Sequence, residues 1–166
     1  MRQAALRRIV DPRACLPWGD LFVTLQFAGD RLAQVRIVDR PEPATPLAGA
    51  PREAADLVAQ FLADGKTDLA SLDVDLAGVS PFDQEALREL RRVRAGQTVT
   101  YGDLAKRLGK GPGASRAVGG AMARNPLPIV IPCHRVVQAG GALGHYSGFG
   151  GVATKLRLLQ LEGSRW

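Results

Sequence analysis

The segment that decides the fold is TVTYGDLAKRLGKGPGASRAVGGAMARN, residues 98–125. Thr100 can cap a short helix with an apolar stripe, and the glycine-rich residues 109–113 can form a turn. A second helix is expected from about Ala114 to Arg124. Two short helices joined by a glycine-containing turn predict a helix-turn-helix, in which the second helix meets DNA.

The second helix of this segment has very little side-chain bulk. Its small residues are Ala117, Gly119, Gly120 and Ala121. Each glycine costs a helix about 1 kcal/mol relative to alanine, so the pattern needs a compensating use. Close approach of the helix backbone to a nucleic-acid surface is one such use, and a tight helix–helix contact is the alternative.

Upstream, Ser80 can cap a further helix, with Pro81 at its first position, and Gly96 is expected to end it. Downstream, Asn125-Pro126 breaks the second helix of the motif, because a residue before proline avoids α geometry.

The rest of the second half contains three further elements. Residues 129–131 predict a short buried extended segment, and the glycine-rich residues 136–151 predict a hairpin or wing. Residues 152–162 predict an amphipathic closing helix that Gly163 ends.

The first half of the chain reads as a small α/β unit. Residues 21–27 and 32–38 alternate roughly between apolar and polar side chains around a turn, which predicts a β-hairpin. Residues 52–63 predict an amphipathic helix that Gly65 ends. The fold class is therefore α/β (α+β), with an N-terminal scaffold domain over 1–78 and a mainly helical domain over 79–166.

Composition indicates a globular protein. The 166 residues are 46% hydrophobic, and no apolar run approaches the roughly 20 residues of a membrane helix. The N-terminus lacks the apolar core and cleavage site of an export signal. Cys15 and Cys133 are expected to be reduced thiols, and a cytoplasmic location follows, close to the nucleoid in a prokaryote.

Charge is divided unevenly along the chain. Residues 1–80 carry nine Lys and Arg against eleven Asp and Glu, whereas residues 81–166 carry thirteen against five. A basic half predicts a surface that meets a polyanion. A generic arginine-rich surface is the alternative, and charge alone does not choose between a nucleic acid and an acidic protein.

The chemistry is concentrated in PIVIPCHRVV, residues 128–137. Free cysteine is often a small core residue, so packing is one interpretation of Cys133. The other is a nucleophile, which needs a positive neighbour or a histidine base to gain thiolate character. His134 is adjacent and would act through a water or a small turn, with the carboxylate of Glu162 orienting it.

These segments together resemble the O6-alkylguanine-DNA alkyltransferase family, the methylated-DNA–protein-cysteine S-methyltransferases. The matching motifs are TYGDLA (100–105), SRAVGGAM (115–122), NPLPIVIPCHRVV (125–137), GHYSG (144–148) and KLRLLQLEG (155–163). The resemblance covers roughly residues 80–163, while the N-terminal half matches only in general shape. It implies DNA repair by one irreversible alkyl transfer from O6-alkylguanine, with O4-alkylthymine as a further substrate class.

The resemblance also implies roles for individual residues. Cys133 is the alkyl acceptor, and His134, Glu162 and Asn125, with a water, keep it activated. Arg116 enters the base stack that the flipped nucleotide leaves, and the Val136 carbonyl reads the guanine amino group. The residues expected to contact DNA or the flipped base are Tyr101, Arg116, Ala121, Met122, Arg135, Val136, Tyr146, Ser147 and Lys155.

These roles agree with the physics of the reaction. An O6-alkyl group lies inside the duplex, so the base must be flipped out at a cost of a few kcal/mol. A helix with little bulk suits the minor groove, and hydrogen bonding from Tyr101 or Ser147 would make the guanine oxygen a better leaving group. No metal or organic cofactor is required. The expected partner is duplex DNA containing O6-alkylguanine, bound by a monomer, with cooperative binding left open.

Three alternatives remain at this stage. Alkyltransferase-like damage sensors share the helix-turn-helix but lack the cysteine, so the cysteine in PCHRV argues against them. A helix-turn-helix regulator would use Cys133 only for packing. A cysteine hydrolase would need a substrate cleft, for which the sequence shows no motif.

Overall fold

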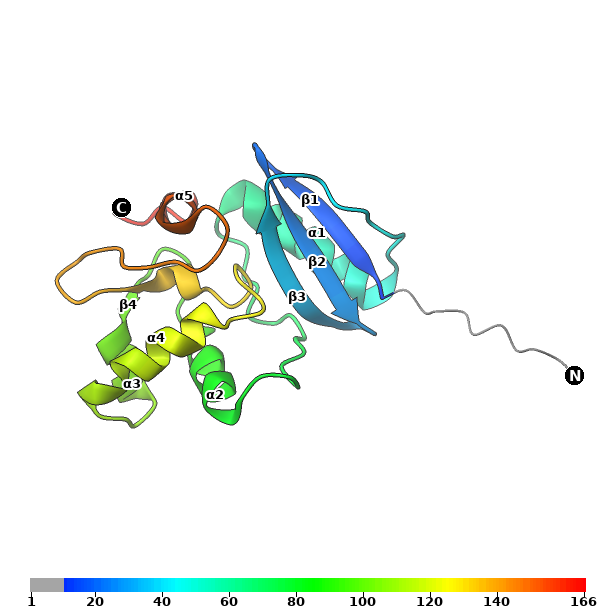
Figure 1. The fold of residues 1–166 in the computed structure, drawn as a ribbon. Coiled ribbons are helices and arrows are strands. Elements are labelled where there is room, and N and C mark those ends of the chain that lie inside the picture. Colours follow the sequence, from blue (N-terminus) through cyan, green and yellow to red (C-terminus); the bar gives the residue numbers. More distant parts are fainter. Residues whose placement is uncertain (1–10) are drawn as a thin grey trace, which may run out of the picture.

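The computed structural model describes residues 11–166. Residues 1–10 lie outside the described residues. The start of the expected N-terminal domain therefore also lies outside them, as does most of the N-terminal segment in which we expected no export signal. The described chain is a mixed α and β structure, which confirms the predicted fold class (Figure 1).

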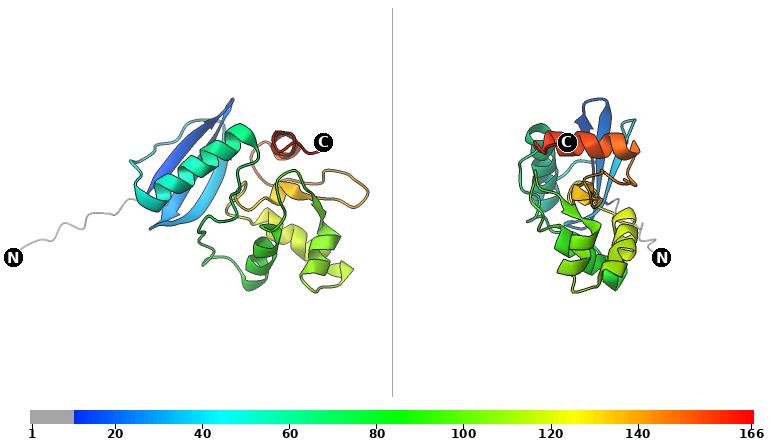
Figure 2. Two further views of the ribbon diagram at one scale, coloured as in Figure 1. Left: turned by 180° about the vertical axis from the view of Figure 1, so that it is seen from behind. Right: turned by 90° about the vertical axis from the view of Figure 1, so that its left-hand side faces the viewer.

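A three-stranded antiparallel sheet forms the first half, in the order β1 (Arg13–Trp18), β2 (Leu21–Ala28), β3 (Arg31–Val38). The helix α1 (Gly49–Asp64) covers one face of it (Figure 2). The predicted hairpin is confirmed, but β1 was not predicted. Its sequence, RACLPW, contains a proline, which a strand tolerates at a sheet edge because its missing N–H is not needed there.

The free edge of β3 is occupied by two other parts of the chain. Leu32 exchanges backbone hydrogen bonds with Asp73 and Asp75, at 3.0 and 2.8 Å. Further along, the Val35 N–H donates to the Pro126 carbonyl at 2.9 Å. These contacts satisfy an edge that would otherwise be open to pairing with another chain. They also join the sheet to the segment that leads to Cys133.

The second half is mainly helical (Figure 1). Its elements are α2 (Pro81–Leu90), β4 (Val99–Thr100), α3 (Tyr101–Arg107), the 3₁₀ turn η1 (Pro112–Ala114), α4 (Ser115–Ala123), the 3₁₀ turn η2 (Cys133–Arg135), β5 (Val136–Val137) and α5 (Gly151–Leu161). The predicted caps are confirmed: the Ser80 hydroxyl accepts from the Asp83 N–H, and the Thr100 hydroxyl accepts from the Asp103 N–H. The predicted helix-turn-helix is therefore present as α3 and α4.

Two predictions for this half were wrong, and a third is only partly matched. The α2 helix ends at Leu90, and irregular turns fill the interval to Gly96. Residues 129–131 are buried but not extended, since Ile129 has a φ of +75° and the Ile131 N–H turns back to the Leu127 carbonyl. Of the hairpin or wing expected over residues 136–151, Val136–Val137 form β5, which pairs in parallel with β4, and the rest is a loop in which the Gln138 N–H donates to the Ala142 carbonyl at 2.9 Å.

A single apolar cluster runs through both halves, from Phe61 of α1 to Leu158 of α5. The division into domains at residues 78 and 79 therefore stays a prediction. The segment at this boundary connects α1 to the cap of α2, and it includes the isolated pairing of Val74 with Leu32.

The cap of α1 lies directly against the end of α5. Gly65 has a φ of +62°, and a Cβ there would lie 2.0 Å from the Leu161 carbonyl oxygen. We expect Gly65→Ala to lower the free energy of unfolding by more than the roughly 1–2 kcal/mol of a left-handed residue. Chemical denaturation would measure it. Gly29→Ala is the matched control, because its φ is +59° and its Cβ would meet nothing within 4 Å; equal losses would contradict the contact.

Candidate active site

Cys133 begins the turn η2, and the backbone before it is held by Asn125. The Asn125 amide donates to the Ile131 carbonyl at 2.8 Å, and its oxygen accepts from the Leu127 N–H at 3.0 Å. One side chain therefore ties both ends of the loop that carries the cysteine. Within residues 11–166, Ile129 in this loop is the one non-glycine residue with a positive φ. A β-branched residue adopts that conformation only under constraint from its surroundings.

The Cys133 thiol is buried, and its burial raises its pKa above the ordinary value. The Asn125 side chain and the positive charge of Lys155 oppose this shift without outweighing it. The resting group is therefore a thiol, and its proton must be removed for it to act as a nucleophile.

His134 and Glu162 form a buried pair behind the cysteine. The His134 Nε2 lies 2.7 Å from Glu162 Oε1, and neither side chain is exposed. Burial lowers the pKa of His134, with Glu162 opposing it. Burial alone would raise the pKa of Glu162, but His134 and Arg135 hold it at about 2. An ionised carboxylate only accepts, so Nε2 carries the proton and Nδ1 keeps its lone pair.

The other histidine nitrogen is available for chemistry. His134 Nδ1 is buried and has no hydrogen-bond partner within the described part of the chain. A neutral imidazole with a fixed Nε2–H and a free Nδ1 is the form that can accept a proton from a neighbouring thiol.

Two residues expected to contact DNA are instead buried within the protein. The Arg135 guanidinium donates to both oxygens of Glu162 and to the Val93 carbonyl. The Lys155 ammonium donates to the carbonyls of Val136, Leu143 and His145. The resemblance implied contacts of both side chains with DNA or the base, but here hydrogen bonds within the protein occupy their donors.

Lys155 holds the wall of the site in place. Its three carbonyl partners lie in β5 and in the loop that follows, so one ammonium joins α5 to both. Its burial lowers its pKa to about 8, although the nearby Cys133 opposes the shift. The Val136 carbonyl, expected to read a guanine amino group, already accepts from Lys155 at 2.7 Å and keeps its second lone pair.

A pocket of about 210 Å³ opens onto Cys133. It is lined by Tyr101, Gly119, Met122, Ala123, Cys133, His145, Tyr146 and Ser147. These residues come from α3, α4, η2 and the loop before α5. Of the nine residues predicted to contact DNA or the base, the tertiary fold brings four together here, namely Tyr101, Met122, Tyr146 and Ser147. Burial and the nearby Cys133 raise the pKa of both tyrosines, which therefore remain O–H donors. The Tyr146 hydroxyl is buried and has no partner within residues 11–166.

The helix α4 presents a mixture of core and surface positions. Arg116 and Ala117 are exposed, whereas Ala121 is fully buried. Ala121 therefore faces the core, and the DNA contact expected of it does not fit this position. Gly119 faces the pocket, since a Cβ there would lie 3.9 Å from the Tyr101 ring.

The contact that anchors α4 was not predicted from the sequence. The Arg124 guanidinium, just beyond its last turn, donates to both oxygens of the buried Asp83 of α2, at 2.7 and 2.9 Å. Arg124 lowers the pKa of Asp83, so this carboxylate stays charged. The two residues lie 41 positions apart, and no local sequence pattern indicates their pairing.

Two negative findings apply to residues 11–166. No group of three or more His, Cys, Asp or Glu side chains lies close enough to hold a metal ion. No helix there has the length and apolar character to cross a bilayer.

The fold and site define a class: helix-turn-helix proteins in which a buried cysteine, backed by a histidine–carboxylate pair, forms the floor of a pocket beside the second helix. Comparison with known proteins agrees. The family model for the DNA binding domain of 6-O-methylguanine DNA methyltransferase matches residues 81–164. The chain belongs to the family of methylated-DNA–protein-cysteine methyltransferases.

Individual relatives support this assignment to different extents. The methyltransferase of Mycobacterium leprae is 40% identical over 139 residues, covering 81% of each chain. That of Thermococcus kodakarensis is 48% identical over 102 residues, which cover 60% of this chain but only 55% of the relative. The match to the Mus musculus protein covers 34% of that relative's length.

The fold is shared with solved structures. The crystal structure of Mycobacterium tuberculosis OGT in complex with DNA has a TM-score of 0.75 and 33% identity, over 91% of this chain and 92% of that one. The O6-methylguanine-DNA methyltransferase from Pyrococcus kodakaraensis has a TM-score of 0.69 and 30% identity, over 91% and 98%.

Proposed function

We propose that this protein repairs DNA by direct reversal, transferring the alkyl group of O6-alkylguanine to Cys133 in a single irreversible turnover. The observation that carries the proposal is the position of the thiol, on a pocket of about 210 Å³ between α4 and the loop before α5, with the His134–Glu162 pair behind it. A packing role for Cys133 would not need a pocket, and a damage sensor would not need the cysteine.

The reaction uses one nucleophile and two proton transfers. The Cys133 proton moves toward His134 Nδ1, through a water, as the sulfur attacks the alkyl carbon. A carbon–sulfur bond forms, the bond from the alkyl carbon to guanine O6 breaks, and its electron pair stays on the oxygen. A tyrosine hydroxyl at the pocket, Tyr101 or Tyr146, stabilises that oxygen by donating a hydrogen bond. In the second proton transfer the guanine anion takes up a proton from water at N1, and His134 returns the thiol proton to water, so that charge balances. The products are unmodified guanine and S-alkylcysteine, and no cofactor takes part.

DNA binding on the α4 face brings the lesion to this pocket. Gly119 leaves space beside the Tyr101 ring, and Arg116 is exposed at the start of the helix. A flipped guanine would enter the pocket beside Gly119 and the Tyr101 ring, while the Arg116 side chain fills the space that the base leaves in the stack. The affinity for DNA should fall with rising salt, because Lys and Arg contacts release counterions from phosphates. We place this activity in the cytoplasm, as expected from the sequence.

The direct test is to mix the protein with duplex DNA containing O6-methylguanine and to weigh the peptide that contains Cys133. The expected result is a gain of one methyl group at Cys133, stoichiometric with the lesion, and the return of guanine in the DNA. Binding to the lesion without methyl gain would favour a damage sensor, and equal affinity for damaged and undamaged duplex would favour a regulator.

Arg116 should matter for base extrusion more than for binding. We expect Arg116→Ala to slow methyl transfer from duplex DNA by about 10-fold or more, a loss of 1.4 kcal/mol or more of the few kcal/mol that flipping costs. Transfer from single-stranded DNA, where no stack must be opened, should change much less. Single-turnover assays on both substrates would measure this. Arg52→Ala on the remote helix α1, where Arg52 is also exposed, is the control; equal losses on both substrates would contradict this role.

A further inference from the structure

Arg135 follows Cys133 by two residues, yet its guanidinium is not at the pocket onto which the cysteine opens. It does not line the 210 Å³ pocket that Cys133 lines. It lines instead a larger cleft of about 750 Å³, together with Val93 and Glu162. Only 10% of its side chain is exposed, so the protein holds a buried cation beside the histidine–carboxylate pair.

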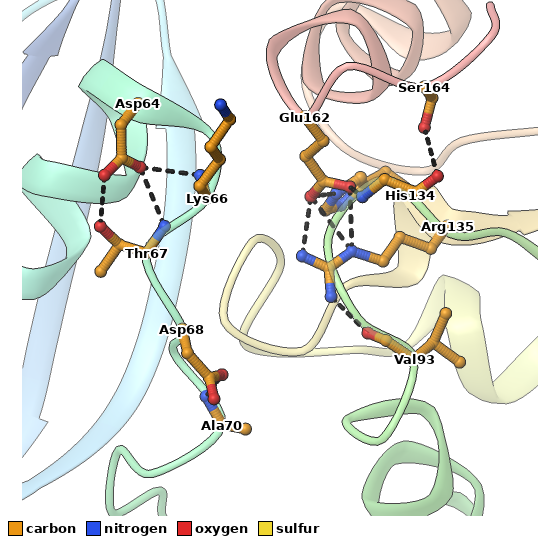
Figure 3. Close-up of polar contacts among 11 residues, drawn as sticks. Asp64, Lys66, Thr67, Asp68, Ala70, Val93, His134, Arg135, Glu162 and Ser164 are labelled. Atoms are coloured by element: carbon orange, nitrogen blue, oxygen red, sulfur yellow. Dashed lines mark hydrogen bonds and ion pairs between the residues drawn. The ribbon is translucent and has the colours of Figure 1, made fainter.

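The donors around Glu162 fix its carboxylate completely (Figure 3). Oε1 accepts from His134 Nε2 at 2.7 Å and from Arg135 Nη2 at 2.8 Å. Oε2 accepts from the Gly96 N–H at 3.1 Å, and Arg135 Nε lies 3.1 Å from both oxygens. A carboxylate held in this way cannot rotate, so the same oxygen always faces the histidine.

We propose that Arg135 is a positioning residue for alkyl transfer: it orients Glu162 and offsets its charge, so that His134 remains neutral with Nδ1 ready to accept the thiol proton. The proposal rests on the proposed alkyl transfer. The charge balance gives the reason: an uncompensated carboxylate beside a buried histidine favours imidazolium, which has no lone pair to accept a proton. With Arg135 in place, the Glu162 carboxylate keeps its hydrogen bond to His134 Nε2. The positive guanidinium partly cancels the negative charge that the carboxylate presents to the imidazole ring.

The other charges around the pair act less directly. Lys155 of α5 also disfavours a charged His134, but its ammonium is bonded to three backbone carbonyls and not to Glu162. Across the open cleft, the Asp64 carboxylate accepts from the backbone N–H groups of Lys66 and Thr67 and from the Thr67 hydroxyl (Figure 3).

The remaining charged residues that line the cleft are Lys66, Asp68, Arg91, Arg92 and Arg94. Asp68 accepts from the Ala70 N–H, and Arg92 pairs with Glu89. Arg91 donates to backbone carbonyls of residues 69–72. Within residues 11–166, Arg135 is therefore the one Lys or Arg side chain in ion-pair contact with Glu162.

The test compares Arg135→Gln with Arg135→Lys in single-turnover methyl transfer across pH. For Arg135→Gln, the acidic limb of the rate profile should move up by about 1–3 pH units, because a charge has been removed beside the base. At pH values below the shifted limb, the rate of Arg135→Gln should be lower than that of wild type by about tenfold for each pH unit of the shift. Arg135→Lys keeps the charge but loses the two-pronged contact, so it should be slower with an unmoved limb.

Arg92→Gln is the matched control, since Arg92 lines the same cleft without touching Glu162 and should leave both rate and limb unchanged. A folded Arg135→Gln protein with an unmoved limb would overturn the proposal, as would an equal shift in Arg135→Lys.

A second measurement needs no variant at Arg135 and no activity. Nitrogen-15 NMR of the wild-type histidine rings, assigned by difference from His134→Gln, should show neutral His134 with its proton on Nε2 at pH 7. An imidazolium at that pH would overturn the proposal. If wild-type protein shows no methyl transfer, the proposed function fails, and the NMR result still decides the charge state that Arg135 is proposed to maintain.

Discussion

Cys133→Ser should abolish methyl transfer while leaving DNA affinity within about twofold of wild type. A serine hydroxyl is a far weaker nucleophile than a cysteine thiol, because its proton is much harder to remove. The histidine here is arranged to remove a thiol proton. The substitution changes one atom in a buried position, so the pocket and the α4 surface should persist. The measurement is the mass of the peptide containing residue 133 after incubation with O6-methylguanine duplex, together with a binding isotherm on the same duplex.

Cys15→Ser is the matched control for this experiment. Cys15 lies in β1, and its sulfur accepts a 3.4 Å hydrogen bond from the backbone N–H of Glu42. It lines none of the cavity that opens at Cys133. Full transfer in this variant and none in Cys133→Ser would assign the acceptor, whereas methyl gain in Cys133→Ser would refute it.

Glu162→Gln should be the most destabilising single substitution at the site, by about 3–5 kcal/mol near neutral pH. The substitution leaves the buried Arg135 cation without its counter-charge. It also replaces one of the two carboxylate oxygens, which together accept hydrogen bonds from three residues, by an NH2 group that cannot accept. Urea denaturation would measure the loss. Asp56→Asn is the control, because its ion pair with Arg52 is mostly exposed and should contribute no more than about 0.5 kcal/mol.

The same carboxylate should make stability depend on pH. The pKa of Glu162 is lowered from 4.5 to about 2, so its contribution is fully present above pH 4.5 and is lost as the pH falls toward 2. The size of this contribution is up to about 3 kcal/mol. Unfolding curves from pH 6 to pH 2 should therefore converge for wild type and Glu162→Gln. Parallel curves would show that Glu162 is not ionised in the folded protein.

Local sequence signals predicted the elements that depend on local chemistry. Ser80 and Thr100 cap helices as predicted, and Gly65 ends α1 in the left-handed conformation that glycine tolerates. The alternation in residues 21–38 predicted the hairpin because each strand has one buried face. The strand β1 was not predicted, since the alternation of RACLPW is weak and the strand with which it pairs, β2, lies outside that segment.

The candidate site likewise contains residues that a local motif predicted and residues whose positions depend on tertiary contacts. The motif PCHRV, with a carboxylate on the last helix, identified Cys133, His134 and Glu162, and the structure places the last two 2.7 Å apart. Arg135 and Lys155 were expected to contact DNA or the flipped base because of the resemblance to the family. Both are buried, since carboxylate and carbonyl partners from distant segments satisfy their donors.

The sequence by itself therefore determined which residue we propose to react, which helices form and where α2 and α3 are capped, because these depend on neighbours within a few positions. Only the tertiary structure decided which cations are buried in ion pairs and which face solvent. Arg116 and Arg135 are the same residue type in the same basic half, and one is exposed while the other is buried against Glu162. The physical reason is that desolvating a guanidinium is costly unless a partner is already in place, and the chain supplies that partner from 27 positions away.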